Sequence, residues 1–328
     1  MNNFVVTKTP MRISFVGGGT DFKEFYKKNN GGAVLNATIN KYVYIIINKY
    51  HDPERCLLKY SKTEIIKKVE DIKHPLLKGC IKNMKVWGLD INSVADIAGG
   101  TGLGSSSSFT VGLINALEYY QGKSISKKNL ANKACDIEIN QLKLPTGKQD
   151  QFAASFGGLN LIKFHKNEKT EVEKINNKSI INFLNKNIII INTGVIKKNK
   201  AVLTEQVKNI KKGKKFSDHL NFMRDSVFEF KNYLLKKDLK ICGEILDENW
   251  KRKKDLAKGI TNSYINEMYY ESLKCGALGG KILGAGGRGY LMLICPQNRQ
   301  NLIKKKFRKF NFLNFKFEND GSKRILRI

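Results

Sequence analysis

Several features that would assign this chain to a particular class are absent from its 328 residues. No run of about 18 apolar residues is present, so we expect no membrane-spanning helix. The N-terminal segment lacks the basic, apolar and small-residue order of a signal peptide. The six cysteines are scattered without a CxxC pair or zinc spacing, and the four histidines do not cluster. We therefore expect a cytoplasmic protein with reduced thiols and no membrane partner.

Acidic residues are few: 29 Asp and Glu stand against 59 Lys and Arg, which gives a net charge of +30. Such an excess is compatible with nucleic-acid binding. The basic residues are spread over the whole length, however, and no nucleic-acid-binding motif accompanies the dense runs at 211–215, 251–254 and 304–309. A general bias towards lysine and asparagine explains the charge, and attraction of anionic substrates is the second explanation. We expect no nucleic-acid partner.

A glycine- and serine-rich stretch is the most informative feature that is present. Residues 98–108 read AGGTGLGSSSS and lead into an apolar segment with helical periodicity. Glycines allow the backbone to approach an anion closely, and the N-terminus of a helix favours negative charge. The stretch predicts a phosphate-binding loop. An ordinary glycine turn with serine capping is the alternative.

Two familiar phosphate-binding motifs do not fit this stretch. Gly99 and Gly104 have the Walker A spacing, but Ser105 stands where that motif has lysine. The glycines at 100, 102 and 104 do not form the dinucleotide motif GxGxxG. A second glycine-rich run at 283–289 does contain GxGxxG, but it leads into a predicted strand and not into a helix. A dinucleotide site is therefore not predicted.

The apolar periodicity predicts an α+β chain. Strands are expected at 4–16, 157–162, 187–194, 290–294 and 324–328, one or two strands at 33–48, and helices at 105–120 and 127–142. Strands and polar turns are expected up to residue 97, and lysine-rich helices from 197 to 270. After the strand at 187–194 the sequence pattern becomes helical and lysine-rich. This change predicts domains at 1–186 and 187–328.

Four ordered segments resemble the motifs of the GHMP small-molecule kinases. They are TPMRISFVGGGTD at 9–21, GGTGLGSSSS at 99–108, GKQDQF at 147–152 and LGAGGRG at 283–289. The resemblance implies a two-domain GHMP kinase fold, with a ribosomal protein S5 domain 2-like N-terminal domain and a ferredoxin-like C-terminal domain. It also implies ATP and Mg²⁺. The chain departs from the family pattern because no proline precedes the second segment.

The resemblance also implies roles for individual residues. Asp150 would act on the attacking sugar hydroxyl as a base or as an electrostatic anchor, and Arg12 would pair with Asp150 or with a transferring phosphate. Mg²⁺ would be held by Ser106 and Glu138. The assignment of Glu138 assumes a one-residue insertion relative to some relatives, and a solvated helix carboxylate is the alternative. ATP would be bound by Gly100, Gly102, Leu103, Gly104, Ser105, Ser106 and Ser107.

Within the superfamily, the first segment is most similar to the D-glycero-D-manno-heptose 7-phosphate kinases. Galactokinases have Glu and His at the positions of Gly18 and Gly19, so two sugar-contacting side chains are missing here. The resemblance implies phosphorylation of the anomeric C1 hydroxyl to the 1,7-bisphosphate, for GDP-heptose and surface polysaccharide biosynthesis. A kinase for fucose or galactose is the nearest alternative, and a basic nucleic-acid-binding protein is a more distant one.

The substrate itself would contact the first and third glycine segments. The implied residues are Gly18, Gly19, Thr20, Asp21, Gly286, Gly287 and Arg288. A phosphorylated substrate also needs an anion site at its far end, and the candidates are Arg288, Lys197, Lys198 and Lys200. Asp21 would hold sugar hydroxyls, with a turn or N-cap role as the alternative. The expected partner is a small-molecule sugar phosphate, and a homodimer stays open.

Overall fold

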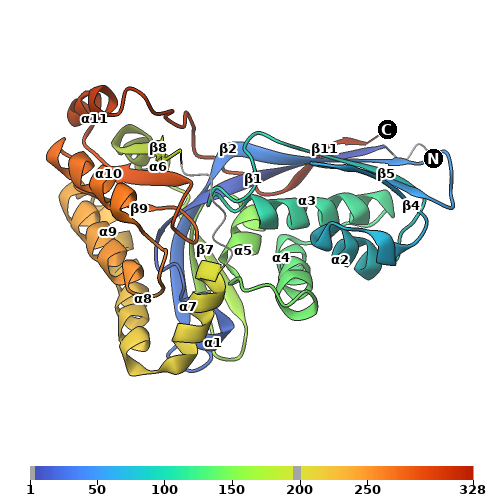
Figure 1. The fold of residues 1–328 in the computed structure, drawn as a ribbon, viewed down its shortest axis with the longest axis horizontal. Coiled ribbons are helices and arrows are strands. Elements are labelled where there is room, and N and C mark those ends of the chain that lie inside the picture. Colours follow the sequence, from blue (N-terminus) through green and yellow to red (C-terminus); the bar gives the residue numbers. More distant parts are fainter. Residues whose placement is uncertain (1–3, 195–200, 328) are drawn as a thin grey trace.

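A long β-sheet and a smaller one, each with its own helices, make up the described part of the chain (Figure 1). The computed structural model describes residues 4–194 and 201–327. Within these residues the larger sheet has eight strands in the order β11–β1–β2–β5–β3–β4, with β6 and β7 attached beside β2. They are β1 (Val5–Val16), β2 (Gly32–Lys49), β3 (Cys56–Lys59), β4 (Thr63–Ile66), β5 (Leu89–Ala95), β6 (Leu159–Phe164), β7 (Thr170–Lys174) and β11 (Lys323–Arg327).

The central strands β1 and β2 are the β-branched segments that the sequence predicts as strands, and this prediction is confirmed. The second segment forms one continuous strand. β1 is buried from Thr9 onward because helices pack against it. Its register on β2 shifts between Ser14 and Val16, directly before the glycines at 17–19. Such a shift bends the strand where it leads into the first glycine segment.

The helices of this half are α1 (Lys23–Tyr26), α2 (Pro75–Met84), α3 (Ser105–Tyr120), α4 (Lys127–Cys135), α5 (Gln149–Phe156) and α6 (Lys178–Asn187). Among them, α3 runs along the large sheet (Figure 1). Helix α3 has the bounds that the sequence predicts, and it packs against β1 and β2 along a nearly wholly buried length. The predicted helix at 127–142 is also present, but its second part, Asp136–Gln141, is a π-helix.

The prediction of strands and polar turns up to residue 97 is wrong for α2. Pro75 stands at the start of this helix, where its missing N–H is tolerated, and the Leu77 N–H donates to the His74 side chain at 3.3 Å. Its buried residues Leu76, Leu77, Cys80, Ile81 and Met84 follow a helical period. The proline at the helix start and the helical spacing of apolar residues were both present in the sequence.

The C-terminal half is built around the smaller sheet, in the order β8–β10–β9 within the described residues. The strands are β8 (Ile188–Asn192), β9 (Gly279–Ile282) and β10 (Tyr290–Ile294), and the helices are α7 (Ala201–Lys212), α8 (Lys214–Leu235), α9 (Leu239–Lys254), α10 (Ser263–Lys274) and α11 (Gln300–Lys306). An antiparallel bridge from Phe312 to Ile191 continues the sheet beyond β8. This β–α–β–β–α–β order is that of a ferredoxin-like fold, as the resemblance implies.

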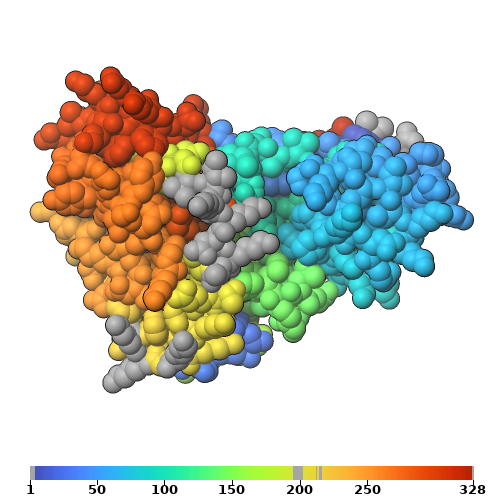
Figure 2. Space-filling view, viewed as in Figure 1, coloured from blue at the N-terminus to red at the C-terminus, as the bar shows by residue number. Residues whose placement is uncertain are grey.

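The end of the chain leaves this smaller sheet and returns to the larger one. Phe317 forms a bridge to Ile39, and β11 pairs antiparallel with β1. The last strand therefore belongs to the sheet of the N-terminal half, although the predicted division assigns it to 187–328. The two halves occupy opposite ends of the molecule in the space-filling view (Figure 2). Among residues 4–194 and 201–327, no helix has both the length and the apolar character needed to cross a bilayer.

Candidate active site

The second and third glycine segments lie against each other, backbone to backbone. A Cβ atom on Gly102 would lie 2.2 Å from the Leu283 carbonyl oxygen, and one on Gly284 would lie 2.5 Å from the Gly102 Cα. A Cβ atom on Gly289 would lie 2.2 Å from the Thr101 carbonyl oxygen. Side chains at these positions would push the loops apart. The glycines therefore serve close packing of the two halves of the chain at this junction.

The second glycine segment ends at an uncapped helix N-terminus. Gly100, Gly102 and Gly104 have φ values of +77°, +88° and +75°, which side chains rarely adopt. Gly104 is the N-cap of α3, and no side chain caps this helix. The first N–H groups of a helix have no intrahelical acceptor, so this terminus is suited to bind an anion. The loop thus has the geometry that the sequence predicts for a phosphate site.

The four serines after this loop divide into two pairs. The Ser107 hydroxyl donates to Glu138 Oε2 at 2.9 Å, and the Ser108 hydroxyl donates to the Pro10 carbonyl oxygen at 2.8 Å. Ser105 and Ser106 instead line an open groove beside the loop, with an empty volume of about 1230 Å³. Leu103 is fully buried, so its side chain anchors the loop in the core, and its carbonyl oxygen accepts from the Arg12 N–H at 2.9 Å.

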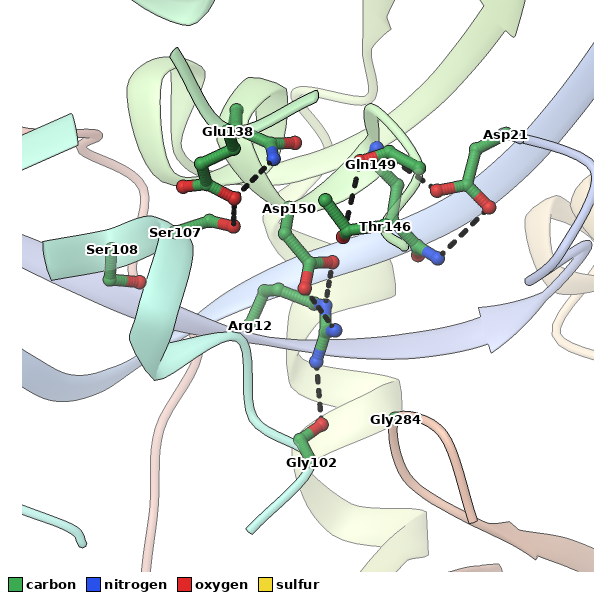
Figure 3. A network of polar contacts seen from close by, with 12 residues as sticks. Arg12, Asp21, Gly102, Ser107, Ser108, Glu138, Thr146, Gln149, Asp150 and Gly284 are labelled. Carbon is green, nitrogen blue, oxygen red and sulfur yellow. Dashed lines mark hydrogen bonds and ion pairs between the residues drawn. The ribbon is translucent and has the colours of Figure 1, made fainter. Parts of the chain in front are cut away.

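Arg12 and Asp150 form a bidentate ion pair at the centre of the site (Figure 3). Arg12 on β1 donates from Nε to Asp150 Oδ1 at 2.7 Å and from Nη2 to Asp150 Oδ2 at 2.6 Å. Its remaining nitrogen, Nη1, donates to the Gly102 carbonyl oxygen at 2.6 Å. The planar guanidinium therefore connects the carboxylate at the start of α5 to the glycine loop. Of the two partners implied for Arg12, the structure shows Asp150.

Glu138 is a buried carboxylate directly behind the start of α3. Its Oε2 accepts from Ser107 at 2.9 Å and from Gln151 Nε2 at 2.7 Å, whereas its Oε1 has no partner among the described residues. Glu138 lies on the π-helix, which has a wider turn than an α-helix. The alternative of a solvated helix carboxylate is wrong, because Glu138 is only 2% exposed.

Glu138 is suited to bind Mg²⁺, but the predicted second ligand, Ser106, does not contact it. Burial raises the pKa of Glu138 to about 7, and the unpartnered Oε1 is a hard oxygen ligand of the kind that Mg²⁺ prefers. Ser106 is exposed and lines the groove, while the serine in contact with Glu138 is Ser107. No cluster of three or more His, Cys, Asp or Glu side chains occurs in the described ranges. A cation here would take its other ligands from ATP and water.

We expect Glu138→Gln to remove a pH dependence of stability in the absence of metal and nucleotide. The raised pKa means that the folded protein keeps a proton that the unfolded chain loses at lower pH, so wild-type stability falls as pH rises from an ordinary glutamate pKa to about 7. Glutamine mimics the protonated form. Denaturant unfolding should therefore show the variant gaining on the order of 1 to 3 kcal/mol over wild type between pH 5 and pH 8. A constant difference would contradict this prediction.

The first glycine segment presents Asp21 beside the ion pair. Asp21 accepts from the Gly19 N–H at 3.0 Å and from the Gln149 N–H at 3.2 Å. Burial, followed by the charge of Asp150, raises the pKa of Asp21. A Cβ atom on Gly147 would lie 2.0 Å from Asp21 Oδ2, so the glycine of GKQDQF makes room for this carboxylate. Figure 3 shows Asp21 and Asp150 on either side of Gln149.

A cleft with an empty volume of about 550 Å³ opens beside Asp21 and Asp150. Sequence reasoning predicted part of its lining and missed two buried lysines, Lys253 at the end of α9 and Lys281 on β9. The lining residues are Arg12, Ser14, Gly18, Gly19, Asp21, Phe22, Thr146, Gly147, Gln149, Asp150, Leu203, Gln206, Lys253, Lys281, Gly284 and Ala285.

The two lysines are held by backbone carbonyl groups. Lys253 Nζ donates to the Gly284 oxygen at 2.5 Å, and Lys281 Nζ donates to the Phe15 oxygen at 3.0 Å. Burial, followed by the charge of Arg12, lowers the pKa of Lys253 to about 8. Burial, followed by the charge of Lys253, holds the pKa of Lys281 well below its usual range. Lys253 belongs to the basic run 251–254, which the sequence analysis treated as general compositional bias.

Several predicted substrate residues lie elsewhere. The Thr20 hydroxyl donates to the carbonyl oxygens of Gly17 and Ala33 at 2.8 and 2.7 Å, so it fastens the loop to β2. Cβ atoms on Gly286 and Gly287 would lie 2.5 Å from the Ile260 oxygen and 2.4 Å from the Gly259 oxygen. These two glycines therefore allow close packing against residues 259–260.

Arg288 differs most from its predicted place. It lines the groove beside the nucleotide loop, and a Cβ atom on Gly100 would lie 2.5 Å from Arg288 Nη2. Its position matches a role near ATP and not one at the far end of the substrate. The other predicted anion-site residues, Lys197, Lys198 and Lys200, lie outside the described residues.

Comparison with known proteins agrees with this geometry. The family descriptions "GHMP kinases N terminal domain" and "GHMP kinases C terminal" match residues 75–158 and 230–312. The chain belongs to the GHMP kinase superfamily, and the predicted kinase activity and two-domain α+β fold are confirmed.

Individual relatives cover nearly the whole chain. A D-glycero-alpha-D-manno-heptose 7-phosphate kinase of Campylobacter jejuni is 28% identical over 97% of this chain and 97% of its own. A crystal structure of a D-glycero-D-manno-heptose 1-phosphate kinase from Bacteriodes thetaiotaomicron superposes with a TM-score of 0.80 and 24% identity, covering 99% of both chains. The structure of Lactococcus lactis galactokinase in complex with galactose superposes with a TM-score of 0.79 and 17% identity, covering 98% of this chain and 95% of its own.

Proposed function

We propose that this GHMP kinase transfers the γ-phosphoryl group of ATP to the anomeric C1 hydroxyl of D-glycero-D-manno-heptose 7-phosphate, giving the 1,7-bisphosphate. The observation that carries the proposal is the Arg12–Asp150 pair, which lies between the glycine loop and the cleft. The 28% identical heptose 7-phosphate kinase supports the choice of sugar. The product would serve GDP-heptose and surface polysaccharide synthesis.

The chain's own residues would mainly position the reactants. Phosphoryl transfer requires alignment and charge stabilisation more than covalent chemistry. The loop at 100–104 and the start of α3 would hold the phosphates of ATP, and Glu138 with Ser106 would hold Mg²⁺, which supplies positive charge to the phosphate oxygens. Asp150 would orient the sugar hydroxyl. A carboxylate is too weak a base to deprotonate a sugar hydroxyl before attack, so Asp150 would receive the proton late in the reaction.

The groove beside the loop offers room for the rest of the nucleotide. Apolar and aromatic side chains lie next to Ser105 and Ser106 there, among them Tyr60, His74 and Phe109. His74 and Phe109 have ring centroids 5.0 Å apart. Aromatic side chains bind the flat faces of nucleobases, so this groove would hold the adenosine part of ATP.

We expect the phosphorylated heptose to be preferred over the free sugar by at least about tenfold in kcat/KM, which is about 1.4 kcal/mol. The reason is that binding energy from a remote charged group can be expressed at the reacting centre. An ADP-release assay with heptose 7-phosphate, free heptose, fucose and galactose measures the preference directly. Equal turnover of any free sugar would refute the heptose 7-phosphate assignment, whereas the kinase assignment would stand.

Two further expectations remain predictions. The six cysteines are free, and five of them are buried, which fits the predicted cytoplasmic location. The homodimer also remains a prediction. Membership of the GHMP kinase superfamily favours the kinase over the nucleic-acid alternative.

A further inference from the structure

We propose that Lys281, together with Ser14, Gln149 and Lys253, forms the binding site for the phosphate group that the sugar substrate carries. This inference rests on the proposed function and identifies the residues that recognise the far end of the substrate. Of the residues predicted for this anion site, Arg288 lines the nucleotide groove, and Lys197, Lys198 and Lys200 lie outside the described residues.

The space beside Gly18 is surrounded by three polar side chains. A Cβ atom on Gly18 would lie 3.7 Å from Gln149 Nε2, 3.8 Å from Ser14 Oγ and 4.0 Å from Lys281 Nζ. These side chains come from three different elements: Ser14 from β1, Gln149 from the start of α5 and Lys281 from β9. An amide N–H, a hydroxyl and an ammonium group therefore converge on one point in the cleft. Such a set of donors matches the oxygens of a phosphate group.

Polar atoms at this point lack protein partners. Ser14 is 4% exposed, yet its hydroxyl has no hydrogen-bond partner within the described ranges, and the same holds for Gln149 Oε1. A buried polar group without a partner is costly, so native proteins retain such groups where a ligand or water satisfies them. The Ser14 hydroxyl borders the cleft. A ligand in the cleft would supply its missing hydrogen bond.

The charged side chains that line the cleft also favour an anionic ligand. Among the described residues that line it, the charged side chains are Arg12, Lys253, Lys281, Asp21 and Asp150. Asp150 is paired with Arg12, whereas both lysines are hydrogen-bonded to backbone carbonyl oxygens. Three basic side chains stand against two acidic ones in this cleft, and an anion bound there would stabilise the charged forms of the two lysines, whose pKa burial lowers. A neutral sugar would not have this effect, and a phosphate dianion would.

This set of donors is separate from the nucleotide loop. Ser14, Gln149 and Lys281 line the cleft beside Asp21, and none of them lines the groove that contains Ser105 and Ser106. Conversely, no residue of 99–106 lines the cleft. The phosphate that these side chains receive is therefore that of the acceptor substrate and not a phosphate of ATP.

Lys281→Met tests the proposal, with Lys251→Met as the matched control. Lys251 lies on the same helix as Lys253, but it is exposed and pairs with Asp247. We expect Lys281→Met to lower kcat/KM for heptose 7-phosphate about tenfold or more and to change kcat/KM for free heptose less than about threefold. Lys253→Met should act in the same direction. The control should behave like wild type with both sugars.

Gly18→Ala provides a second variant that keeps the fold. The new methyl group would make only ordinary contacts of 3.7 to 4.0 Å, and Gly18 does not have a positive φ. It would occupy the space between the three donors. We expect an unchanged melting temperature and a KM for heptose 7-phosphate that rises about tenfold, with the KM for ATP unchanged.

The outcomes separate this inference from the proposed function. If wild type prefers heptose 7-phosphate and Lys281→Met and Gly18→Ala keep the full preference, the phosphate binds elsewhere and the inference is wrong while the function stands. If the variants raise the KM for ATP instead, these residues bind the nucleotide and the inference is wrong. If wild type shows no preference for the phosphorylated sugar, the substrate assignment and the inference fail together.

Discussion

Asp150→Asn is expected to lower kcat by a factor on the order of 10² to 10⁴ while ATP affinity stays similar. Both carboxylate oxygens of Asp150 are bonded to Arg12, with distances of 2.7 and 2.6 Å. Asparagine keeps the shape but removes the negative charge and one acceptor, because its NH₂ group would face the guanidinium. The effect would fall on the transition state, where the sugar hydroxyl releases its proton.

A calorimetric titration with a nonhydrolysable ATP analogue, combined with steady-state rates, measures the two quantities separately. Arg12→Lys is a useful companion variant, because lysine keeps the charge but cannot hold Asp150 and the Gly102 carbonyl oxygen at once. Its kcat should lie between those of wild type and Asp150→Asn. Near-normal turnover of Asp150→Asn would remove Asp150 from the catalytic step.

Gly104→Val is expected to weaken ATP binding by a factor on the order of 10² with little loss of fold. Gly104 has a φ of +75°, and a Cβ atom there would lie 3.2 Å from Arg12 Cγ. A β-branched residue would strain this backbone and shift the N-terminus of α3, where the phosphates of ATP are expected to bind. Calorimetry with ATP in the presence of Mg²⁺ measures the loss.

Gly122→Val provides the matched control for this prediction. Gly122 follows the other end of α3 with the same φ of +75°, and a Cβ atom there would meet nothing within 4 Å. Both variants introduce valine at a left-handed position, so they share the backbone strain. Only Gly104→Val should lose ATP affinity. Equal affinities in the two folded variants would show that the loop at 99–104 does not bind the nucleotide.

Local patterns allowed the sequence to predict much of the fold. The β-branched runs of β1 and β2 and the serine-led apolar segment of α3 were predicted because propensity and periodicity agree with the packing there. The return of β11 to β1 could not be predicted, because strand pairing over the whole chain length leaves no local signal. The sequence predicted a helix at 127–142 but did not predict that residues 136–141 form a π-helix.

The sequence predicted the site residues that belong to recognisable motifs. It missed those whose role depends on whether the folded chain buries them. Arg12 and Asp150 follow from their motifs, and the structure pairs them. Lys253 stands among four consecutive basic residues, and the sequence does not show that this one is 5% exposed. Arg288 lies in the third glycine segment, but the turn carries its side chain to the nucleotide groove. The direction in which a side chain points and its burial are set by the folded chain and cannot be read from one motif.

The product of the reaction tests the central claim most directly. Wild-type protein, ATP, Mg²⁺ and D-glycero-D-manno-heptose 7-phosphate should be incubated and the products followed by ³¹P NMR with proton coupling. The account predicts a new phosphate signal coupled to the anomeric proton, appearing in step with ADP, while the 7-phosphate signal persists. ADP formation without an anomeric phosphate, or a new phosphate on any other hydroxyl, would contradict the account.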